Sequence, residues 1–159
     1  MTYAFKTVVT PVGSLKLVAS DSALIAVLWE NDDPKRVRLG FLVEDVEHPI
    51  LREAEHQLAE YFAGTRKSFD LPLDFSGTPF QKQVWSELLN IPFGQTRTYA
   101  EVANAIGRPR AFRAVGAANG KNPISIVAPC HRVIGKDDSL TGFAGGLKAK
   151  ERLLGIEAT

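Results

Sequence analysis

The stretch TPFQKQVWSELLNIPFGQTRTYAEVANAIG, residues 78–107, carries the strongest structural signals in this chain. Thr78 is followed three residues later by Gln81, and Thr98 is followed at the same spacing by Glu101. This spacing is typical of the capping box, in which two side chains bind the free backbone N–H groups at the start of a helix. The stretch therefore predicts two successive helices, one beginning after each threonine.

A third helix is predicted directly after these two. Residues 111–120, AFRAVGAANG, are rich in Ala and Gly and follow a short RPR connection. Two helices joined by such a tight turn resemble a helix-turn-helix. The last helix offers few of the Arg, Asn or Gln side chains that usually read base edges. Its slim surface suits a phosphate backbone or a narrow groove, but composition alone favours close packing in the core.

The first half of the chain has a different pattern. The runs AFKTVVT, SLKLVAS and ALIAVLWE are β-prone and separated by turns, which predicts a small antiparallel meander. A charged loop, NDDPKRVRLG, follows, and apolar residues then recur at helical spacing from Pro49 to Ala63. We therefore expect an α/β (α+β) fold. A strand-rich domain with one helix, residues 1–72, is joined through an extended linker to a mostly helical domain, residues 77–159.

Composition and charge narrow the range of functions. Hydrophobic residues make up 45% of the 159 residues and charged residues 23%, as in an ordinary globular protein. No apolar run approaches the length of a membrane span, and a single cysteine fits a reducing cytoplasm and excludes a cysteine-rich zinc site. We expect a cytoplasmic protein without membrane contact. Residues 1–80 carry 8 Lys/Arg and 12 Asp/Glu, a net charge of −4, whereas the remainder carries 11 and 6, a net charge of +5. This asymmetry favours a polyanion as partner of the second half.

The only cysteine lies in the stretch IVAPCHRVIG, residues 126–135. A free cysteine is commonly a small buried hydrophobic residue. Here Cys130 is followed by His131, a potential base, and Arg132, a positive charge that would favour the thiolate, so the pattern indicates a nucleophile. Adjacent residues in an extended strand face opposite sides. His131 can therefore serve Cys130 only if the chain turns there or a water bridges the two.

The motif PCHRV, preceded by NPI and followed by a Gly-rich loop, resembles the active-site signature of the O6-alkylguanine-DNA alkyltransferases. The resemblance extends from residue 77 to about residue 157, through GTPFQKQVWSELL, RTYAEVANAIGRPRAFRAVGAANGKNPI and LTGFAGGLKAKERLL. The N-terminal half matches this family more loosely. The resemblance implies a winged helix-turn-helix-like DNA-binding motif in the C-terminal domain, whose slim helix enters the minor groove.

The resemblance also implies roles for individual residues. Cys130 matches the alkyl acceptor, and His131 matches the base that takes its proton through a bridging water. Glu157 matches the carboxylate that orients this histidine, and Asn122 matches the residue that braces the turn. Tyr99 matches the tyrosine that aids base rotation and protonates the leaving guanine.

The same resemblance assigns the DNA contacts and the substrate pocket. Arg113 matches the arginine that replaces the flipped nucleotide in the stack. The predicted DNA-contacting residues are Tyr99, Arg113, Ala114, Ala117 and Arg132. The predicted pocket residues are Cys130, Val133, Phe143, Ala144 and Gly145, with the carbonyl groups of Cys130 and Val133 holding the guanine amino group. Phe143 and Ala144 stand where some members have Tyr and Ser, which leaves the range of alkyl groups open.

The implied activity is DNA repair by self-alkylation. The protein would flip out O6-alkylguanine, chiefly O6-methylguanine and with O4-methylthymine as a further candidate, and transfer the alkyl group irreversibly to Cys130. The expected partner is double-stranded DNA, with no cofactor and no metal, bound by a monomer whose cooperativity on DNA stays open. The alternatives are a non-enzymatic protein that binds alkylated lesions, a cysteine hydrolase and a DNA-binding regulator.

Overall fold

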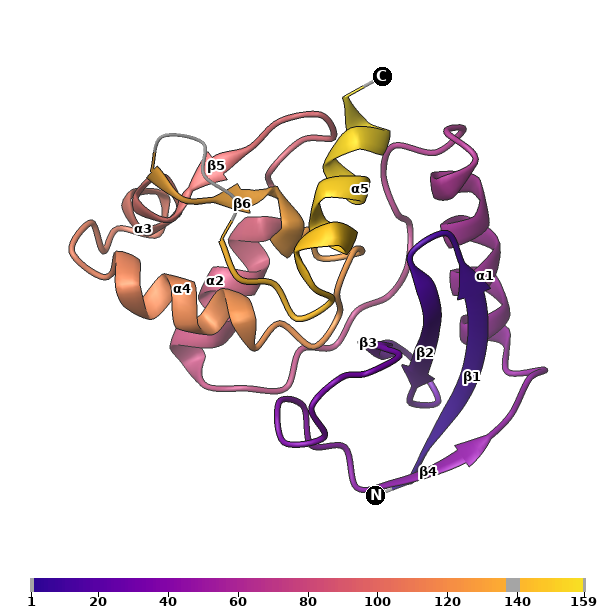
Figure 1. Cartoon of the computed structure of the whole chain (residues 1–159). Coiled ribbons are helices and arrows are strands. Elements are labelled where there is room, and N and C mark those ends of the chain that lie inside the picture. The colour runs from indigo at the N-terminus through magenta and orange to yellow at the C-terminus, as the bar shows by residue number, and fades with distance from the viewer. Residues whose placement is uncertain (1, 137–140, 159) are drawn as a thin grey trace.

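The apolar runs of the N-terminal half form a twisted sheet. A computed structural model describes residues 2–136 and 141–158 of the chain. Strands β1 (Thr2–Thr10), β2 (Gly13–Ala19) and β3 (Leu24–Trp29) make the predicted antiparallel meander. Helix α1 (Pro49–Phe62) covers one face of this sheet (Figure 1). The first half is therefore strand-rich with a single helix, as predicted.

A fourth strand was not predicted. Strand β4 (Phe41–Glu44) pairs with β1 in parallel, and the order across the sheet is β3-β2-β1-β4. β4 is four residues long and lies at the sheet edge, where Phe41 is 82% exposed. An edge strand of this length buries too little apolar surface to show the alternation that marks a strand in sequence.

The C-terminal half contains the predicted succession of helices. Helices α2 (Pro79–Leu88), α3 (Tyr99–Ala105) and α4 (Phe112–Gly120) follow one another, and both capping boxes form, with the threonine and the third residue exchanging hydrogen bonds. The chain then passes through a short 3₁₀ turn, η1 (Cys130–Arg132), and ends in helix α5 (Leu147–Glu157). Strand β5 (Arg97–Thr98) pairs in parallel with β6 (Val133–Ile134). This pairing joins the start of α3 to the end of η1.

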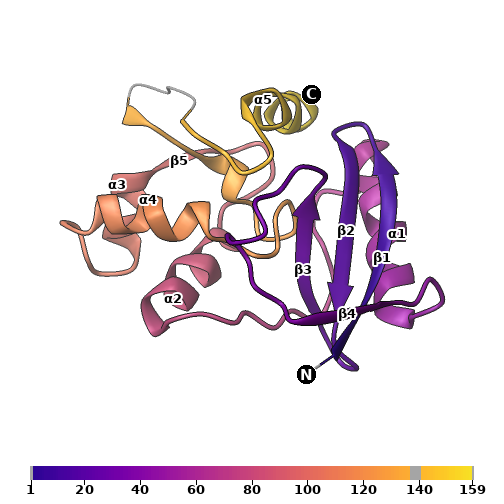
Figure 2. The same ribbon diagram turned by 60° about the horizontal axis from the view of Figure 1, so that its bottom comes forward.

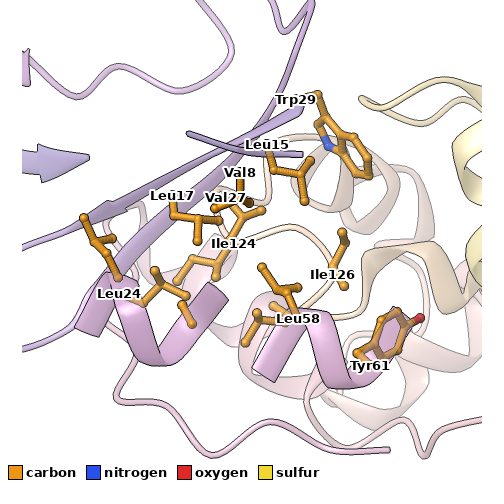
Figure 3. Close-up of a cluster of buried hydrophobic side chains, with 14 of the residues drawn as sticks. Val8, Leu15, Leu17, Leu24, Val27, Trp29, Leu58, Tyr61, Ile124 and Ile126 are labelled. Carbon is orange, nitrogen blue, oxygen red and sulfur yellow. The ribbon is translucent and has the colours of Figure 1, made fainter. Parts of the chain in front are cut away.

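The two halves share the largest hydrophobic cluster of the molecule. Figure 3 shows Leu15 and Val27 of the sheet and Leu58 of α1 gathered around Ile124 and Ile126 of the C-terminal half. Leu153 of α5 is also fully buried in this cluster. Figure 2 shows α5 at one end of the molecule, between the sheet and helices α3 and α4. The segment that leads to η1 is thus packed against the N-terminal half along its length.

One backbone contact fixes this segment to the sheet. The N–H of Val27 in β3 donates a hydrogen bond of 2.9 Å to the carbonyl of Pro123, and Val27 forms a parallel bridge with Ile124. The edge of the sheet therefore continues into the loop before Cys130. No helix within residues 2–136 and 141–158 is both long and apolar enough to cross a membrane.

Candidate active site

The backbone turns at Cys130. Residues 130–132 form the 3₁₀ turn η1, so Cys130 and His131 are not on opposite faces of an extended strand. The side chain of Asn122 makes two hydrogen bonds to the backbone of the loop before Cys130. Its amide Nδ2 donates to the carbonyl of Ala128 at 2.8 Å, and its Oδ1 accepts the N–H of Ile124 at 3.0 Å. This fully buried side chain therefore closes the loop that presents the cysteine.

The same loop holds backbone strain. Ile126 has a φ of +73°, which is unusual for a β-branched residue. The N–H of Val127 donates to the carbonyl of Ser125 at 2.8 Å, closing a tight three-residue turn around Ile126. A second three-residue turn, around Pro129, is closed by the N–H of Cys130 and the carbonyl of Ala128, and it has the common, unstrained inverse γ geometry. A backbone conformation such as that of Ile126 costs about 1–3 kcal/mol and persists where the surrounding structure fixes the backbone.

Glu157 is the centre of a buried hydrogen-bond network. It lies in the last turn of α5 and is 4% exposed. Its carboxylate accepts hydrogen bonds from His131 Nε2 at 2.6 Å, from the hydroxyl of Tyr61 at 2.6 Å and from the backbone N–H of Gly94 at 3.3 Å. The guanidinium of Arg132 donates twice more, at 2.7 and 3.1 Å. This side chain is therefore ordered in the interior, although it lies two residues from the C-terminus.

This network sets the tautomer of His131. Burial raises the pKa of Glu157, but hydrogen bonds from His131 and Arg132 outweigh it and lower the pKa to about 2, so Glu157 is an anion. An anion can only accept, so Nε2 of His131 carries the proton and Nδ1 is the basic nitrogen. Nδ1 has no hydrogen-bond partner among the residues that the structure describes. Burial lowers the pKa of His131, which keeps the ring neutral near pH 7 and ready to accept a proton.

Cys130 rests as a thiol. Burial raises its pKa, while hydrogen bonds to the side chains of Asn122 and Ser125 and the charges of Arg36 and Lys150 act in the opposite direction. The ammonium of Lys150 is fully buried and donates to the carbonyl of Val133 at 2.7 Å. The thiol is thus surrounded by donors and cations that favour the thiolate, and a base is still needed to remove its proton.

One expectation for Arg132, that it contacts DNA, is wrong. Its guanidinium is committed to Glu157 and to the carbonyl of Ile91, at 2.6 Å, and the residue is 6% exposed. It is therefore not available to contact DNA.

The predicted DNA-contacting residues of α4 lie on its exposed face. Arg113, Ala114 and Ala117 are exposed, whereas Val115 and Ala118 are buried, so α4 is half core helix and half free surface. Tyr99, at the start of α3, packs beside Gly116 of α4, and its hydroxyl is hydrogen-bonded to the hydroxyl of Thr141. The tyrosine therefore lies between the exposed helix and the Gly-rich loop.

The predicted pocket residues are not all equivalent. The carbonyl of Cys130 accepts hydrogen bonds from the N–H of Val133 and, at 3.3 Å, from Nδ2 of Asn119. Phe143 is half-buried and packs on the hydrophobic cluster that contains Cys130. Ala144 and Gly145 instead line a cavity of about 170 Å³ together with Trp29. These two residues thus face the N-terminal half.

The comparisons with known proteins decide the family. Residues 79–159 match the family described as "6-O-methylguanine DNA methyltransferase, DNA binding domain", and residues 3–75 match "6-O-methylguanine DNA methyltransferase, ribonuclease-like domain". The chain belongs to the 6-O-methylguanine DNA methyltransferase family. The family and the class of enzyme predicted from the sequence are thereby confirmed.

Individual relatives cover nearly the whole length of this methyltransferase. A methylated-DNA–protein-cysteine methyltransferase of Methanosarcina acetivorans is 48% identical over 94% of this chain and 95% of its own length. The constitutive enzyme of that name from Bacillus subtilis is 46% identical over 96% and 94%. The crystal structure of Mycobacterium tuberculosis OGT in complex with DNA superposes with a TM-score of 0.89, at 43% identity over 99% of this chain and 93% of that one.

Sequence reasoning missed the contribution of the N-terminal half to this methyltransferase's site. Tyr61 binds Glu157, Arg36 donates to the carbonyl of Asn122 at 2.8 Å, and Trp29 donates to Ser125 at 3.1 Å. Lys150 was also missed. These side chains reach the site because segments far apart in the chain pack together, and no local sequence pattern predicts such contacts.

Proposed function

We propose that this protein repairs alkylated DNA by transferring the methyl group of O6-methylguanine to Cys130, once per molecule. The observation that carries the proposal is the pairing of His131 with Glu157. It leaves one basic nitrogen, Nδ1, unpartnered within the described part of the chain, on the residue next to a buried thiol. A purely structural histidine in the interior would have both ring nitrogens satisfied.

The chemistry follows from this arrangement. His131 Nδ1 takes the thiol proton through a bridging water, and the imidazolium that forms is stabilised by the Glu157 anion. The thiolate attacks the methyl carbon, the S–C bond forms, and the bond between that carbon and O6 breaks. Its electron pair goes to guanine, and Tyr99 supplies the proton that the leaving base needs. The imidazolium is the source from which Tyr99 is reprotonated.

The product explains the single turnover. Cys130 becomes an S-methyl thioether, which does not hydrolyse as an acyl thioester does. Cys130 is the only cysteine in the sequence, so the chain has no second thiol that could take the methyl group from it. The active cysteine is consumed with each lesion repaired.

The carbonyl groups of the turn suit the guanine amino group. The carbonyl of Val133 accepts a hydrogen bond from Lys150, and a carbonyl oxygen has two lone pairs. Cys130 already accepts two, and the longer of them, 3.3 Å from Asn119, is the weaker. We infer that the guanine amino group replaces Asn119 at this carbonyl when the base enters.

The exposed face of α4 suits a minor groove. Ala114 and Ala117 place little bulk between the helix backbone and DNA, and Arg113 projects from the same face. Extruding a nucleotide costs a few kcal/mol of stacking and pairing, and less for a badly paired lesion. Arg113 would offset part of this cost by filling the space in the stack.

Intact mass spectrometry tests this proposal. The protein is incubated with a duplex containing O6-methylguanine, and we expect a gain of one methyl group, mapped to Cys130 and absent from the Cys130→Ser variant. The duplex should then contain guanine at the lesion. Tight binding without a change in mass would instead identify a passive lesion-binding protein, and repeated turnover would identify a hydrolase.

A further inference from the structure

Trp29 connects the sheet to the active-site loop. It is the last residue of β3, is 6% exposed, and lies at the margin of the shared core (Figure 3). Its indole Nε1 donates a hydrogen bond of 3.1 Å to the hydroxyl oxygen of Ser125. Ser125 is itself 1% exposed and lies in the strained loop just before Ile126. This is a side-chain contact between residues 96 positions apart in the chain.

Ser125 carries this contact to the sulfur. It lies five residues before Cys130 in the same buried loop, and its hydroxyl acts to lower the pKa of the Cys130 thiol. Because the indole N–H occupies a lone pair of the hydroxyl oxygen, the hydroxyl proton is left to point elsewhere, and the sulfur is a partner that accepts it. A hydroxyl that already accepts a hydrogen bond is also a stronger donor. The hydrogen bond from the indole thus leaves the Ser125 hydroxyl proton free to be donated toward the sulfur.

The ring of Trp29 also fixes the Gly-rich loop. The ring centroid of Phe143 is 5.3 Å from that of Trp29, at an interplanar angle of 70°, an edge-to-face contact. A Cβ atom on Gly145 would lie 2.6 Å from the indole, so only glycine allows this approach. The same indole therefore contacts two loops: the loop before the cysteine, through Ser125, and the Gly-rich loop, through Phe143 and Gly145.

We propose that Trp29 is a positioning residue for methyl transfer, which aims the Ser125 hydroxyl at Cys130 and sets the distance of the Phe143–Gly145 loop from it. The expected effect on methyl transfer rests on the proposed function, in which the Cys130 thiolate is the nucleophile. This role of Trp29 gives the N-terminal half a part in the chemistry. Through Trp29, that half supplies the donor that orients a hydroxyl in the cysteine's own loop.

The test uses Trp29→Phe, which keeps an aromatic ring and removes the N–H. Trp85→Phe is the matched control, because Trp85 is equally buried and its indole donates a 2.8 Å hydrogen bond to the carbonyl of Ala118 rather than toward the cysteine. Since Cys130 is the only cysteine, isotope labelling of the cysteine β-carbon gives one NMR signal whose shift follows the thiol titration without DNA. Methyl transfer from an O6-methylguanine duplex is measured over the same pH range.

We expect Trp29→Phe to move the thiol titration to higher pH and to slow methyl transfer near neutral pH by about threefold to tenfold, as for the loss of one hydrogen bond. Ser125→Ala should do the same, and the double variant should match Ser125→Ala alone. Trp85→Phe should leave the titration in place. An unchanged titration in Trp29→Phe, or an additive effect in the double variant, would overturn the inference. A protein whose titration responds as expected but which transfers no methyl group would instead refute the proposed function.

Discussion

Glu157 receives hydrogen bonds from four residues, and one of them, Tyr61, belongs to the N-terminal half. Tyr61 reaches it from α1, and Gly94 reaches it from the turn before β5. A buried carboxylate is stable only when its lone pairs are satisfied in this way. Each donor also raises the cost of protonating it, so the stability of the protein depends on pH through this residue.

Tyr61→Phe should show this dependence. The folded-state pKa of Glu157, about 2, lies below its ordinary value of 4.5, so its contribution to stability is complete above pH 4.5 and is lost as the pH falls toward 2. Removing one donor should lower the free energy of unfolding by about 2 kcal/mol at neutral pH. Urea unfolding should show this difference narrowing below pH 4.5. Tyr3→Phe, in the sheet, is the control, and a difference that stays constant with pH would contradict the assignment.

Gly145→Ala should disturb the site through Trp29. The added methyl group would lie 2.6 Å from a rigid, buried indole, so the loop has to move away. We expect a loss of about 1–3 kcal/mol of stability, as for other overpacked sites, together with slower methyl transfer. Gly142→Ala, three residues earlier, meets no atom within 4 Å and should leave both stability and transfer unchanged. Equal stability and equal transfer rates of the two variants would show that the contact between Gly145 and Trp29 does not fix the loop.

At the scale of the element, the helices of the C-terminal half are determined locally. The capping boxes at Thr78 and Thr98 form as predicted because each depends on residues within one helical turn. The edge strand β4 was missed because its pairing with β1 is set by distant residues. The wrong expectation for Arg132 has the same cause: the partner that buries it, Glu157, lies 25 positions away. The candidate site could be predicted where the family signature names a residue, and not where the N-terminal half supplies the partner.

Helix α4 yields a prediction for its exposed face. Ala117→Leu should keep the helix, because leucine and alanine have similar helix propensities, but it adds bulk where the minor groove must approach. We expect repair of duplex O6-methylguanine to slow by about tenfold or more, while reaction with the free alkylated base stays unchanged. Ala59→Leu, an exposed position on α1, controls for added surface hydrophobicity. Equal loss with duplex and free base would show that the face does not bind DNA.

Arg113→Ala tests the other part of the same face. The guanidinium is exposed, and its removal should cost the protein little stability. We expect repair in duplex DNA to slow far more than reaction with the free base, because only the duplex requires a nucleotide to be replaced in the stack. Stopped-flow kinetics with both substrates provide the comparison. Equal duplex rates for variant and parent would remove the role assigned to this arginine.

At the scale of the whole molecule, the two halves are expected to unfold together. Their largest hydrophobic cluster contains residues of the sheet, α1 and α5 as well as Ile124 and Ile126, so separating the halves would expose this cluster to water. The chain has two tryptophans, Trp29 in the first half and Trp85 in the second. Trp85→Phe and Trp29→Phe therefore give one fluorescent reporter in each half. In each variant, the fluorescence and far-ultraviolet circular dichroism transitions in urea should coincide. Separate transitions would show two independent units.

The central claim is that one buried thiol, deprotonated by a histidine whose tautomer Glu157 sets, accepts one methyl group and keeps it. The most direct measurement is a titration of the protein with excess duplex O6-methylguanine, in which the guanine restored is counted against the protein present. The account predicts a plateau at one lesion repaired per protein molecule, with every Cys130 methylated. Continued repair beyond that plateau, or lesions bound without loss of their methyl group, would contradict it.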